Sequence, residues 1–456
     1  MKDKTDLTVG NPLQKILLFM LPVLVGNIFQ QVYSAADTII VGRTLGANAL
    51  AAVGSTNSIH FVIFSLMSGL SSGVTILTAQ FIGAGDREKA KRSVAMVYII
   101  GTVMALLCTG FGLLFLRGLF VVLKIPPELY EDAYIYQLIC IGGFAGVLLY
   151  NMVSSLLRAI GDSTTPLVFL IIASVINIGL DFLFILAFGL GVAGAAYATI
   201  LSQTLSGVTC LIYSMKRYEL FRLKPSDFRI EGRFLWDHVR TGLPISVQNS
   251  ITGIGVMFFQ SALNGMGPDA IAAYTACSKI DTFTVSPMFA IATALVTFTA
   301  QNFGAGKKER IREGVKVSLI AEGIFSIVMG AVLIVSCKAL VSIFVGKEEL
   351  EVLRLSRIYM TIESCFLWSA AVLFIFRAAV QGIGETRIPM LGGVLELSMR
   401  ITAAVVVSRI FGFVGISVAT PMAWIAAAAL NMIYYFARSK RDFGLSRVKA
   451  GEPVEI

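Results

Sequence analysis

The chain has 456 residues, of which 56% are hydrophobic and only 14% are charged, and its formal net charge is +9. A soluble domain carries about 25% charged residues, so this chain lacks the polar side chains that would coat one or two soluble cores. The composition therefore excludes an ordinary soluble protein and predicts an all-α membrane protein. Basic loops on the cytoplasmic side of a membrane account for the positive charge, and we expect no nucleic-acid partner.

Twelve apolar segments along the chain are long enough to cross the hydrocarbon layer as helices. In chain order they are 16–42, 50–77, 93–116, 133–156, 166–188, 192–214, 241–262, 270–300, 316–337, 353–376, 389–411 and 415–437. A basic polar break separates the first six from the last six. The predicted parts are a six-helix lobe (1–214), a cytoplasmic linker (215–240), a second six-helix lobe (241–437) and a cytoplasmic tail (438–456).

The distribution of basic residues predicts the orientation of the chain in the membrane. Placing both termini in the cytoplasm assigns about 27 of the 37 lysines and arginines to cytoplasmic segments, as the positive-inside rule requires. The opposite orientation inverts that ratio. We therefore expect a multi-pass protein of the cell membrane, plasma or inner, with both termini cytoplasmic.

The two halves of the chain repeat each other. Residues 78–85 read TAQFIGAG and residues 299–306 read TAQNFGAG, and a basic segment follows each copy. Pro22 likewise corresponds to Pro244. Because each half holds six spans, both halves begin on the same side of the membrane and form parallel repeats. Transporters place substrate sites between such repeats and expose them to each side in turn.

Acidic residues inside the first half predict a cation site. Asp37 lies on the first span and Asp181 on the fifth, and the predicted spans of this half hold no lysine or arginine. At about 1.5 Å per residue, Asp181 and Thr199 lie roughly 12 Å from the outer end, with Asn177 near 17 Å and Asp37 near 8 Å. These oxygen ligands suit a hard monovalent cation or a protonatable carboxyl pair. The alternative places Asp37 in the outer interface and gives Asn177 and Thr199 ordinary packing roles.

Charged side chains of the second half gather at one depth, about 14–17 Å from the outside. They are Lys279, Asp281, Glu363 and Arg400. Glu396 stands one helical turn before Arg400, so one interpretation is a self-neutralising network. In the other, Lys279, Asp281 and Glu363 line a cavity and contact substrate or relay protons. Because the repeat places Arg400 where the first half has Asn177, we expect ion coupling in the first half.

The ordered set of motifs resembles one known family. The twelve spans in two sets, the first helix with Pro22 and Asp37, the two TAQ-x-x-GAG segments and the LRAIGDSTTP sequence at 157–166 are similar to the multidrug and toxic compound extrusion (MATE) family of prokaryotic exporters. The resemblance covers nearly the whole chain. It implies a V-shaped pair of six-helix lobes that exports organic, often cationic, compounds in exchange for H⁺ or Na⁺.

The resemblance also implies functional residues. The family's cation site in the first lobe, for H⁺ or Na⁺, corresponds to Asp37, Asn177, Asp181 and Thr199. Pro22 corresponds to the family's bending proline, Tyr33 to a tyrosine near the site, and Asn151 to a polar residue of the fourth helix. One branch instead uses acids on helices seven and ten. Here helix seven carries Gln248 and Asn249, whereas Glu363 keeps an acid on helix ten.

We therefore predict a secondary antiporter, not an enzyme, that works as a monomer in the lipid bilayer on small organic substrates. It needs no cofactor other than its coupling ion and has no catalytic residues. One alternative is a lipid-linked oligosaccharide flippase, which would line its cavity with cations for a pyrophosphate. A membrane-embedded lipid transferase would need a nucleotide, metal or nucleophile site in a loop. The sequence leaves open the choice between H⁺ and Na⁺ and the identity of the substrate.

Overall fold

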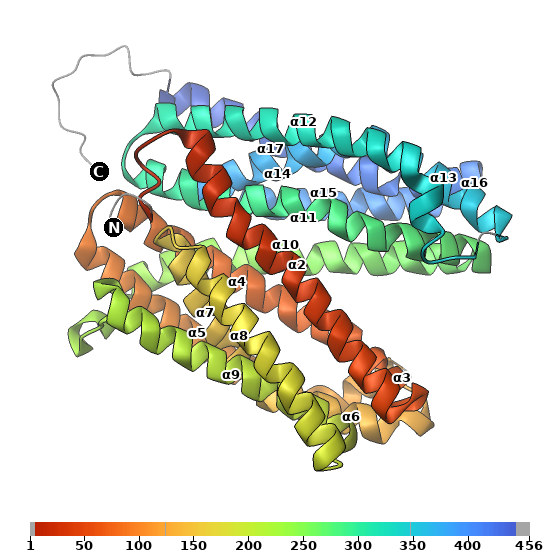
Figure 1. Ribbon diagram of the computed structural model, residues 1–456. Helices are drawn as coiled ribbons and strands as arrows, with labels where there is room; N and C mark the ends of the chain where they lie inside the picture. The colour runs from red at the N-terminus through yellow and green to blue at the C-terminus, as the bar shows by residue number, and fades with distance from the viewer. Residues whose placement is uncertain (1–4, 124, 347, 444–456) are drawn as a thin grey trace.

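The computed structural model describes residues 5–123, 125–346 and 348–443, which form helices and their connections (Figure 1). The first half contains α2 (Pro12–Leu45), α3 (Ala47–Ser55), α4 (Asn57–Gly83), α5 (Arg87–Val122), α6 (Pro127–Gly142), α7 (Phe144–Ala159), α8 (Thr164–Asp181), the π-helical turn η1 (Phe182–Ala187) and α9 (Gly191–Arg217). Two short 3₁₀ turns follow, η2 (Glu219–Phe221) and η3 (Pro225–Phe228). The second half contains α10 (Gly232–Asn264), α11 (Pro268–Gly304), α12 (Lys308–Val341), α13 (Leu350–Cys365), α14 (Leu367–Gly382), α15 (Arg387–Thr402), the π-helical turn η4 (Ala403–Val407), α16 (Ser408–Ser417) and α17 (Ala419–Phe443).

Each of the twelve predicted spans coincides with a helix or a broken helix. Eight described helices, some of them continuing through a π-helical turn, are long and apolar enough to cross a membrane, and the bent pairs α6–α7 (48°) and α13–α14 (46°) raise this number to ten. The helices α10 and α17, of 33 and 25 residues, are more polar and account for the remaining two predicted spans. The expected all-α architecture of twelve spans is confirmed, with two spans broken near their middle.

The two halves form two lobes that meet near one end of the molecule, where α2 begins and where α4 and α11 end. We call this the terminal end. Here α4 packs closely on α10 because its glycines have no side chain. A Cβ on Gly69 would lie 2.5 Å from Cα of Ser246, and one on Gly73 would lie 2.6 Å from Cα of Gly242. Toward the other end the ribbons diverge, and α3 and α6 lie far from α13 and α16 (Figure 1).

The first helix of each lobe crosses to the other lobe. Ile16 and Phe19, in the first half of α2, belong to the same apolar cluster as Phe298 of the second lobe. Beyond Pro22 the helix turns to its own lobe, where Gly26 faces Leu170 of α8. In the same way α10 contributes Ile245 to a cluster with residues of α4. The predicted lobes therefore exchange half of their first helices, which the diagonal course of α2 shows (Figure 1).

Proline inside α10 leaves a backbone carbonyl that another element binds. Pro244 has no N–H, so the carbonyl of Arg240, four residues earlier, loses its helical partner. The hydroxyl of Thr386, just before α15, donates to this carbonyl at 3.3 Å. The local break in α10 is thus tied to the start of α15.

The contact between α4 and α10 predicts a large effect of one methyl group. In Gly69→Ala the new Cβ meets the backbone of Ser246, which has no flexible end that can move aside. We expect a loss of about 1–3 kcal/mol of stability from overpacking, seen as a lower midpoint of thermal unfolding in detergent. Gly110→Ala is the matched control, because nothing lies within 4 Å of its Cβ position in α5 and alanine favours the helix. Equal midpoints for Gly69→Ala and the wild type would contradict this account of the contact.

Candidate functional site

Two carboxyl groups meet inside the first lobe. Asp37 projects from the second half of α2 and Asp181 is the last residue of α8, and the two groups lie within hydrogen-bonding reach of each other. Asp181 is fully buried, and Asp37 is half-buried. In the described part of the chain, Oδ1 of each carboxyl finds no hydrogen-bond donor. Two carboxylates in contact repel strongly where little water screens them, so a proton or a cation between them would relieve this repulsion.

The amide of Asn177 links this pair to the next helix. Asn177 is fully buried one turn before Asp181. Its amide fits with Nδ2 donating to Asp181 Oδ2 at 3.0 Å and Oδ1 accepting from the backbone N–H of Thr199 at 3.1 Å. The amide also lies 3.4 Å from Thr199 Oγ1 on α9. The structure therefore brings Asp37, Asn177, Asp181 and Thr199 together, as the spacing along three helices predicts.

The other predicted residues of this lobe lie at different distances from the carboxyl pair. The hydroxyl of Tyr33 lies near the side chain of Thr199 and near Asp37, which stands one turn further along α2. Asn151 instead donates to the carbonyl of Val147 in its own helix at 2.9 Å. Pro22 lies inside α2, where it separates the half that packs on the second lobe from the half that carries Tyr33.

The surroundings of the carboxyl pair carry no positive charge. No described lysine or arginine interacts with Asp37 or Asp181; their ionisable neighbours are Tyr33, Tyr136 and Cys140. The π-helical turn η1 begins directly after Asp181. Such turns widen a helix and often lie at functional sites. Within the described ranges, the pair therefore has no basic side chain beside it.

A cavity of about 210 Å³ adjoins the carboxyl pair within the first lobe. Its polar lining includes Gln30, Tyr33, His60, Gln137, Tyr150, Asn151, Thr199 and Gln203. Among the described residues, Nε2 of His60 and Oε1 of Gln137 have no hydrogen-bond partner. Most of the remaining lining is apolar or aromatic, as in sites for small organic molecules. Tyr33 and Thr199 belong to both the cavity wall and the carboxyl site, so the two sites share part of their lining.

A second acidic pair lies in the second lobe. Asp281 of α11 and Glu363 of α13 are in hydrogen-bonding reach of each other, and Tyr359 adjoins both. Arg400 of α15 interacts with Glu363 and donates through Nη1 to Thr420 Oγ1 at 3.1 Å. This pair therefore has an arginine beside it, unlike the pair in the first lobe.

Lys279 does not join the acidic pair in a self-neutralising network, and its expected place in the cavity wall stays a prediction. Lys279 is exposed and makes no hydrogen bond or ion pair within the described ranges. The physical reason is the helical period: Lys279 stands two residues before Asp281 in α11, and residues two apart point to different sides of a helix. Lys279 and Asp281 lie at a similar depth in the membrane, but they do not lie on the same face of α11.

The repeat explains the difference between the two acidic sites. Asn177 in the first lobe lies beside Thr199, and Arg400 in the second lobe lies beside Thr420 at the corresponding place. A guanidinium thus stands where the first lobe has a neutral amide. An arginine therefore lies near the acids of the second lobe, whereas none of the described lysines or arginines lies near those of the first.

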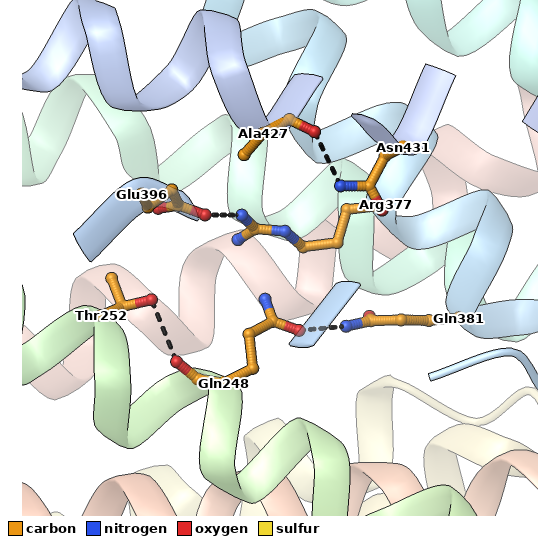
Figure 2. A network of polar contacts seen from close by, with 7 residues as sticks. All are labelled: Gln248, Thr252, Arg377, Gln381, Glu396, Ala427 and Asn431. Carbon is orange, nitrogen blue, oxygen red and sulfur yellow. Dashed lines mark hydrogen bonds and ion pairs between the residues drawn. The ribbon is translucent and has the colours of Figure 1, made fainter. Parts of the chain in front are cut away.

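The expected neighbour of Glu396 is also wrong. Glu396 does not join Arg400 one turn further along α15 but forms an ion pair with Arg377 of α14 (Figure 2). The side chains are 13% and 4% exposed, so this is a buried ion pair. The sequence did not predict Arg377 as an intramembrane residue because the predicted span ends at residue 376, whereas α14 continues to Gly382.

Two glutamines extend this ion pair toward α10. The side-chain amide of Gln248 lies 3.2 Å from Gln381 Nε2 and 3.2 Å from the guanidinium of Arg377 (Figure 2). Gly393 makes room, since a Cβ there would lie 3.0 Å from Cγ of Gln248. At the corresponding place in the first lobe, Gly26 of α2 faces Leu170 of α8. In the second lobe the large residue, Gln248, is on the first helix and the glycine is on the fifth, whereas in the first lobe the glycine is on the first helix and the leucine on the fifth. The contact is therefore polar in the second lobe and apolar in the first.

These features define a class of protein: a helical membrane transporter with two parallel repeats, an ion-binding candidate in one lobe and a small-molecule cavity beside it. The MatE family model matches residues 22–183 and, a second time, residues 244–406. The chain therefore belongs to the MatE family, the multidrug and toxic compound extrusion transporters, and is not an enzyme.

Relatives and solved structures agree with this assignment. The chain is 32% identical over 313 residues to the "Probable multidrug resistance protein YpnP" of Bacillus subtilis, covering 67% of this chain and 68% of the relative. It is 27% identical to the "Probable multidrug resistance protein NorM" of Thermotoga maritima, covering 83% and 82%. A crystal structure of MATE in the bent conformation matches with a TM-score of 0.91 and 24% identity, covering 98% of this chain and 99% of that one.

A second solved structure, the outward-facing conformation of a multidrug resistance MATE family transporter, matches with a TM-score of 0.89 and 24% identity over 96% and 98% of the chains. At this identity the likeness concerns the fold. Together with the family, it confirms the expected resemblance and the multi-pass membrane architecture.

The buried ion pair of the second lobe generates a stability prediction. Arg377→Met leaves the Glu396 carboxylate buried without its partner, which costs about 3–5 kcal/mol in comparable sites. The double variant Arg377→Met, Glu396→Met removes both charges and recovers most of this loss. Unfolding in detergent measures the free energies.

The exposed pair of Arg354 and Glu351 serves as the control, because its side chains are 68% and 51% exposed. We expect Arg354→Met to change stability by less than about 1 kcal/mol. A single Arg377→Met variant as stable as the wild type would show that the pair is not a buried ion pair in the folded protein.

Proposed function

We propose that the protein is a secondary antiporter that exports organic, often cationic, compounds in exchange for H⁺ bound at Asp37 and Asp181. The observation that carries the proposal is the contact between a fully buried carboxyl, Asp181, and the half-buried Asp37, with no lysine or arginine among the described residues around them. Buried charges are otherwise paired, so this pair acts as a site for an external cation.

The details of the contact favour a proton over Na⁺. Two carboxyls remain in hydrogen-bonding contact when one of them holds a proton. The amide oxygen of Asn177 is already occupied by the backbone N–H of Thr199, which removes one expected ligand for a metal ion. Na⁺ is the second candidate, because Oδ1 of Asp37, Oδ1 of Asp181 and the hydroxyl of Thr199 are hard oxygen donors of the required kind.

Helix α2 connects the carboxyl pair to the cavity, so its movement can couple ion binding to substrate release. Its first half is packed in the second lobe, and its second half, beyond Pro22, carries Gln30 and Tyr33 in the cavity wall and then Asp37. A proton at the carboxyl pair removes their repulsion and lets this half of α2 approach α8 and α9. The cavity wall moves with it, so proton binding favours the state that releases substrate.

We place the protein in the plasma or inner membrane with both termini in the cytoplasm. The terminal end, where the lobes touch, is then the cytoplasmic end, and the structure corresponds to a state open to the outside. Protons enter from outside in this state, and the membrane potential contributes about 2.3 kcal/mol per charge per 100 mV. A single chain holds both lobes, so we propose that the monomer is the working unit.

The lining of the cavity supports an organic substrate that carries no phosphate. Neither lysine nor arginine is among the residues that line it. A flippase for lipid-linked oligosaccharides would need cations there for the pyrophosphate. Aromatic and apolar walls with neutral polar groups instead suit organic cations and neutral drugs, in line with the multidrug names of the relatives.

Neutralising one carboxyl tests the coupling site. Asp181→Asn keeps the size of the side chain but cannot bind and release a proton. We expect efflux of a cationic dye driven by a pH gradient to fall to the level of protein-free vesicles. The control is Asp269→Asn, the same substitution at an exposed position near the start of α11. Full gradient-driven efflux by Asp181→Asn would remove the pair from the mechanism.

The choice of ion is tested by changing Na⁺ at fixed pH. Proteoliposomes with an imposed pH gradient should export the dye at the same rate with and without Na⁺. An inward Na⁺ gradient alone, with both sides at one pH, should not drive export. If efflux follows the Na⁺ gradient instead, the carboxyl pair binds Na⁺, and the oxygen donors named above become its ligands.

A further inference from the structure

The two TAQ segments form the joint between the lobes at the terminal end. Gln80, in the first segment, donates through Nε2 to the carbonyl of Gly382 in the second lobe at 3.0 Å. Gln301, its counterpart, donates through Nε2 to the carbonyl of Ala159 in the first lobe at 2.8 Å. Ala159 and Gly382 are themselves the last residues of α7 and α14. The repeat thus produces two equivalent bonds, each crossing from one lobe to the other.

Glycines allow the two segments to touch backbone to backbone. A Cβ on Gly83 would lie 1.9 Å from the carbonyl oxygen of Gln301, and a Cβ on Gly304 would lie 1.8 Å from that of Gln80. No side chain fits in either place. The closed position of the lobes therefore depends on these two glycines and the two glutamine bonds.

A segment before α2 covers one side of this joint. We call Thr5–Gly10 the strap. The N–H of Leu7 donates to Oε1 of Gln301 at 3.1 Å, so this glutamine binds the strap with its oxygen and the first lobe with its nitrogen. The carbonyl of Leu7 accepts from Nδ2 of Asn302 at 3.1 Å. The side chain of Leu7 is 2% exposed and belongs to the apolar cluster of Phe298.

Basic side chains of the second lobe hold the rest of the strap. Nζ of Lys307 donates to the carbonyl of Thr8 at 2.8 Å, and Nη1 of Arg310 donates to the carbonyl of Gly10 at 2.8 Å. The strap also reaches the first lobe, since a Cβ on Gly161 would lie 1.9 Å from the carbonyl oxygen of Thr5. One short segment therefore contacts both lobes at their joint.

The other glutamine has a different environment. Beside Gln80, the corresponding space is a pocket of about 230 Å³ whose lining includes Phe81, Phe234 and Gly384. Gly384 corresponds in the repeat to Gly161, which the strap covers. The two bonds of the joint are thus equivalent, but the strap secures only one of them.

We propose that the strap locks the lobes closed at the terminal end, and that Gln301 is the positioning residue that ties the strap to the joint. When the lobes separate at this end, the bond from Gln301 to Ala159 breaks, and the strap must release or move with one lobe. The strap then sets the equilibrium between the two access states. This proposal rests on the proposed exchange between two access states, but not on the identity of the ion or the substrate.

The distance between the lobes at the terminal end tests the proposal directly. Glu88 and Glu309 are exposed and lie at equivalent places after the two GAG turns. In a cysteine-free background, each is replaced by cysteine and carries a spin label. Leu7→Ala removes the buried side chain of the strap, and Val9→Ala, at a side chain that is 39% exposed, is the matched control. In detergent without any gradient, we expect Leu7→Ala to raise the ratio of open to closed molecules about tenfold or more. Val9→Ala should leave the ratio unchanged.

A comparison of the two glutamines separates the lock from general destabilisation. Gln80→Ala and Gln301→Ala each remove one bond of the joint, but only Gln301→Ala also releases the strap. We expect Gln301→Ala to open the terminal end more than Gln80→Ala does in the full chain. In a chain that starts at a methionine placed before Asn11, the two substitutions should have equal effects.

Two results would overturn the proposal: an unchanged distance distribution in Leu7→Ala, or the same excess effect of Gln301→Ala with and without the strap. Thermal unfolding of each variant shows whether it is folded before the distances are compared. Because the measurement uses neither substrate nor ion gradient, its failure would leave the proposed export function standing. Loss of dye efflux in Asp181→Asn would in turn say nothing about the strap.

Discussion

The contact between Asp37 and Asp181 is the interaction on which the proposed function depends. Two carboxyls buried beside each other without a basic neighbour are unfavourable unless a cation joins them. The helices α2, α8 and α9 nevertheless hold them together, and Asn177 fixes one of them in place. In the proposed function, a cation from outside binds to this pair in the first lobe. The second lobe has the corresponding helices, but there Arg400 lies near the acidic pair.

The repeat therefore gives the molecule equivalent backbones with unequal side chains. Gln248 and the ion pair of Arg377 with Glu396 join α10, α14 and α15 by polar contacts. At the matching place in the first lobe, Gly26 and Leu170 make only an apolar contact. Charged and amide groups require fixed geometry, whereas a glycine against a leucine permits sliding. We infer that the second lobe is the more rigid frame and that the second half of α2, beyond Pro22, is the part that moves.

Much of the fold could be predicted from the sequence because a membrane limits the possibilities. Twelve long apolar segments must be helices, since no backbone group can remain unpaired in lipid. The two TAQ segments established the repeat and hence the parallel lobes. The residues of the first acidic site were also predicted together, because Asn177 and Asp181 share a helix face and Asp37 and Thr199 lie at a similar depth.

Other contacts were beyond the reach of the sequence. Equal depth placed Lys279 with Asp281, but the helical period turns it away. The sequence paired Glu396 with Arg400, one turn along the same helix, whereas a neighbouring helix brings Arg377 to it. No motif in the first ten residues predicted that Leu7 is buried. It is buried because the last turns of α7 and α11 and the first turn of α12 meet around it.

The sequence by itself determined the helices, their number, their repeat and the surplus of acids in the first lobe. These follow from composition and spacing along one chain, which the bilayer converts directly into structure. Only the tertiary structure decided which acids meet, which cations neutralise them and which lobe holds the strap. Those outcomes depend on how helices are rotated and packed against each other, and that rotation is set by contacts between residues up to some 300 positions apart, such as Leu7 and Gln301.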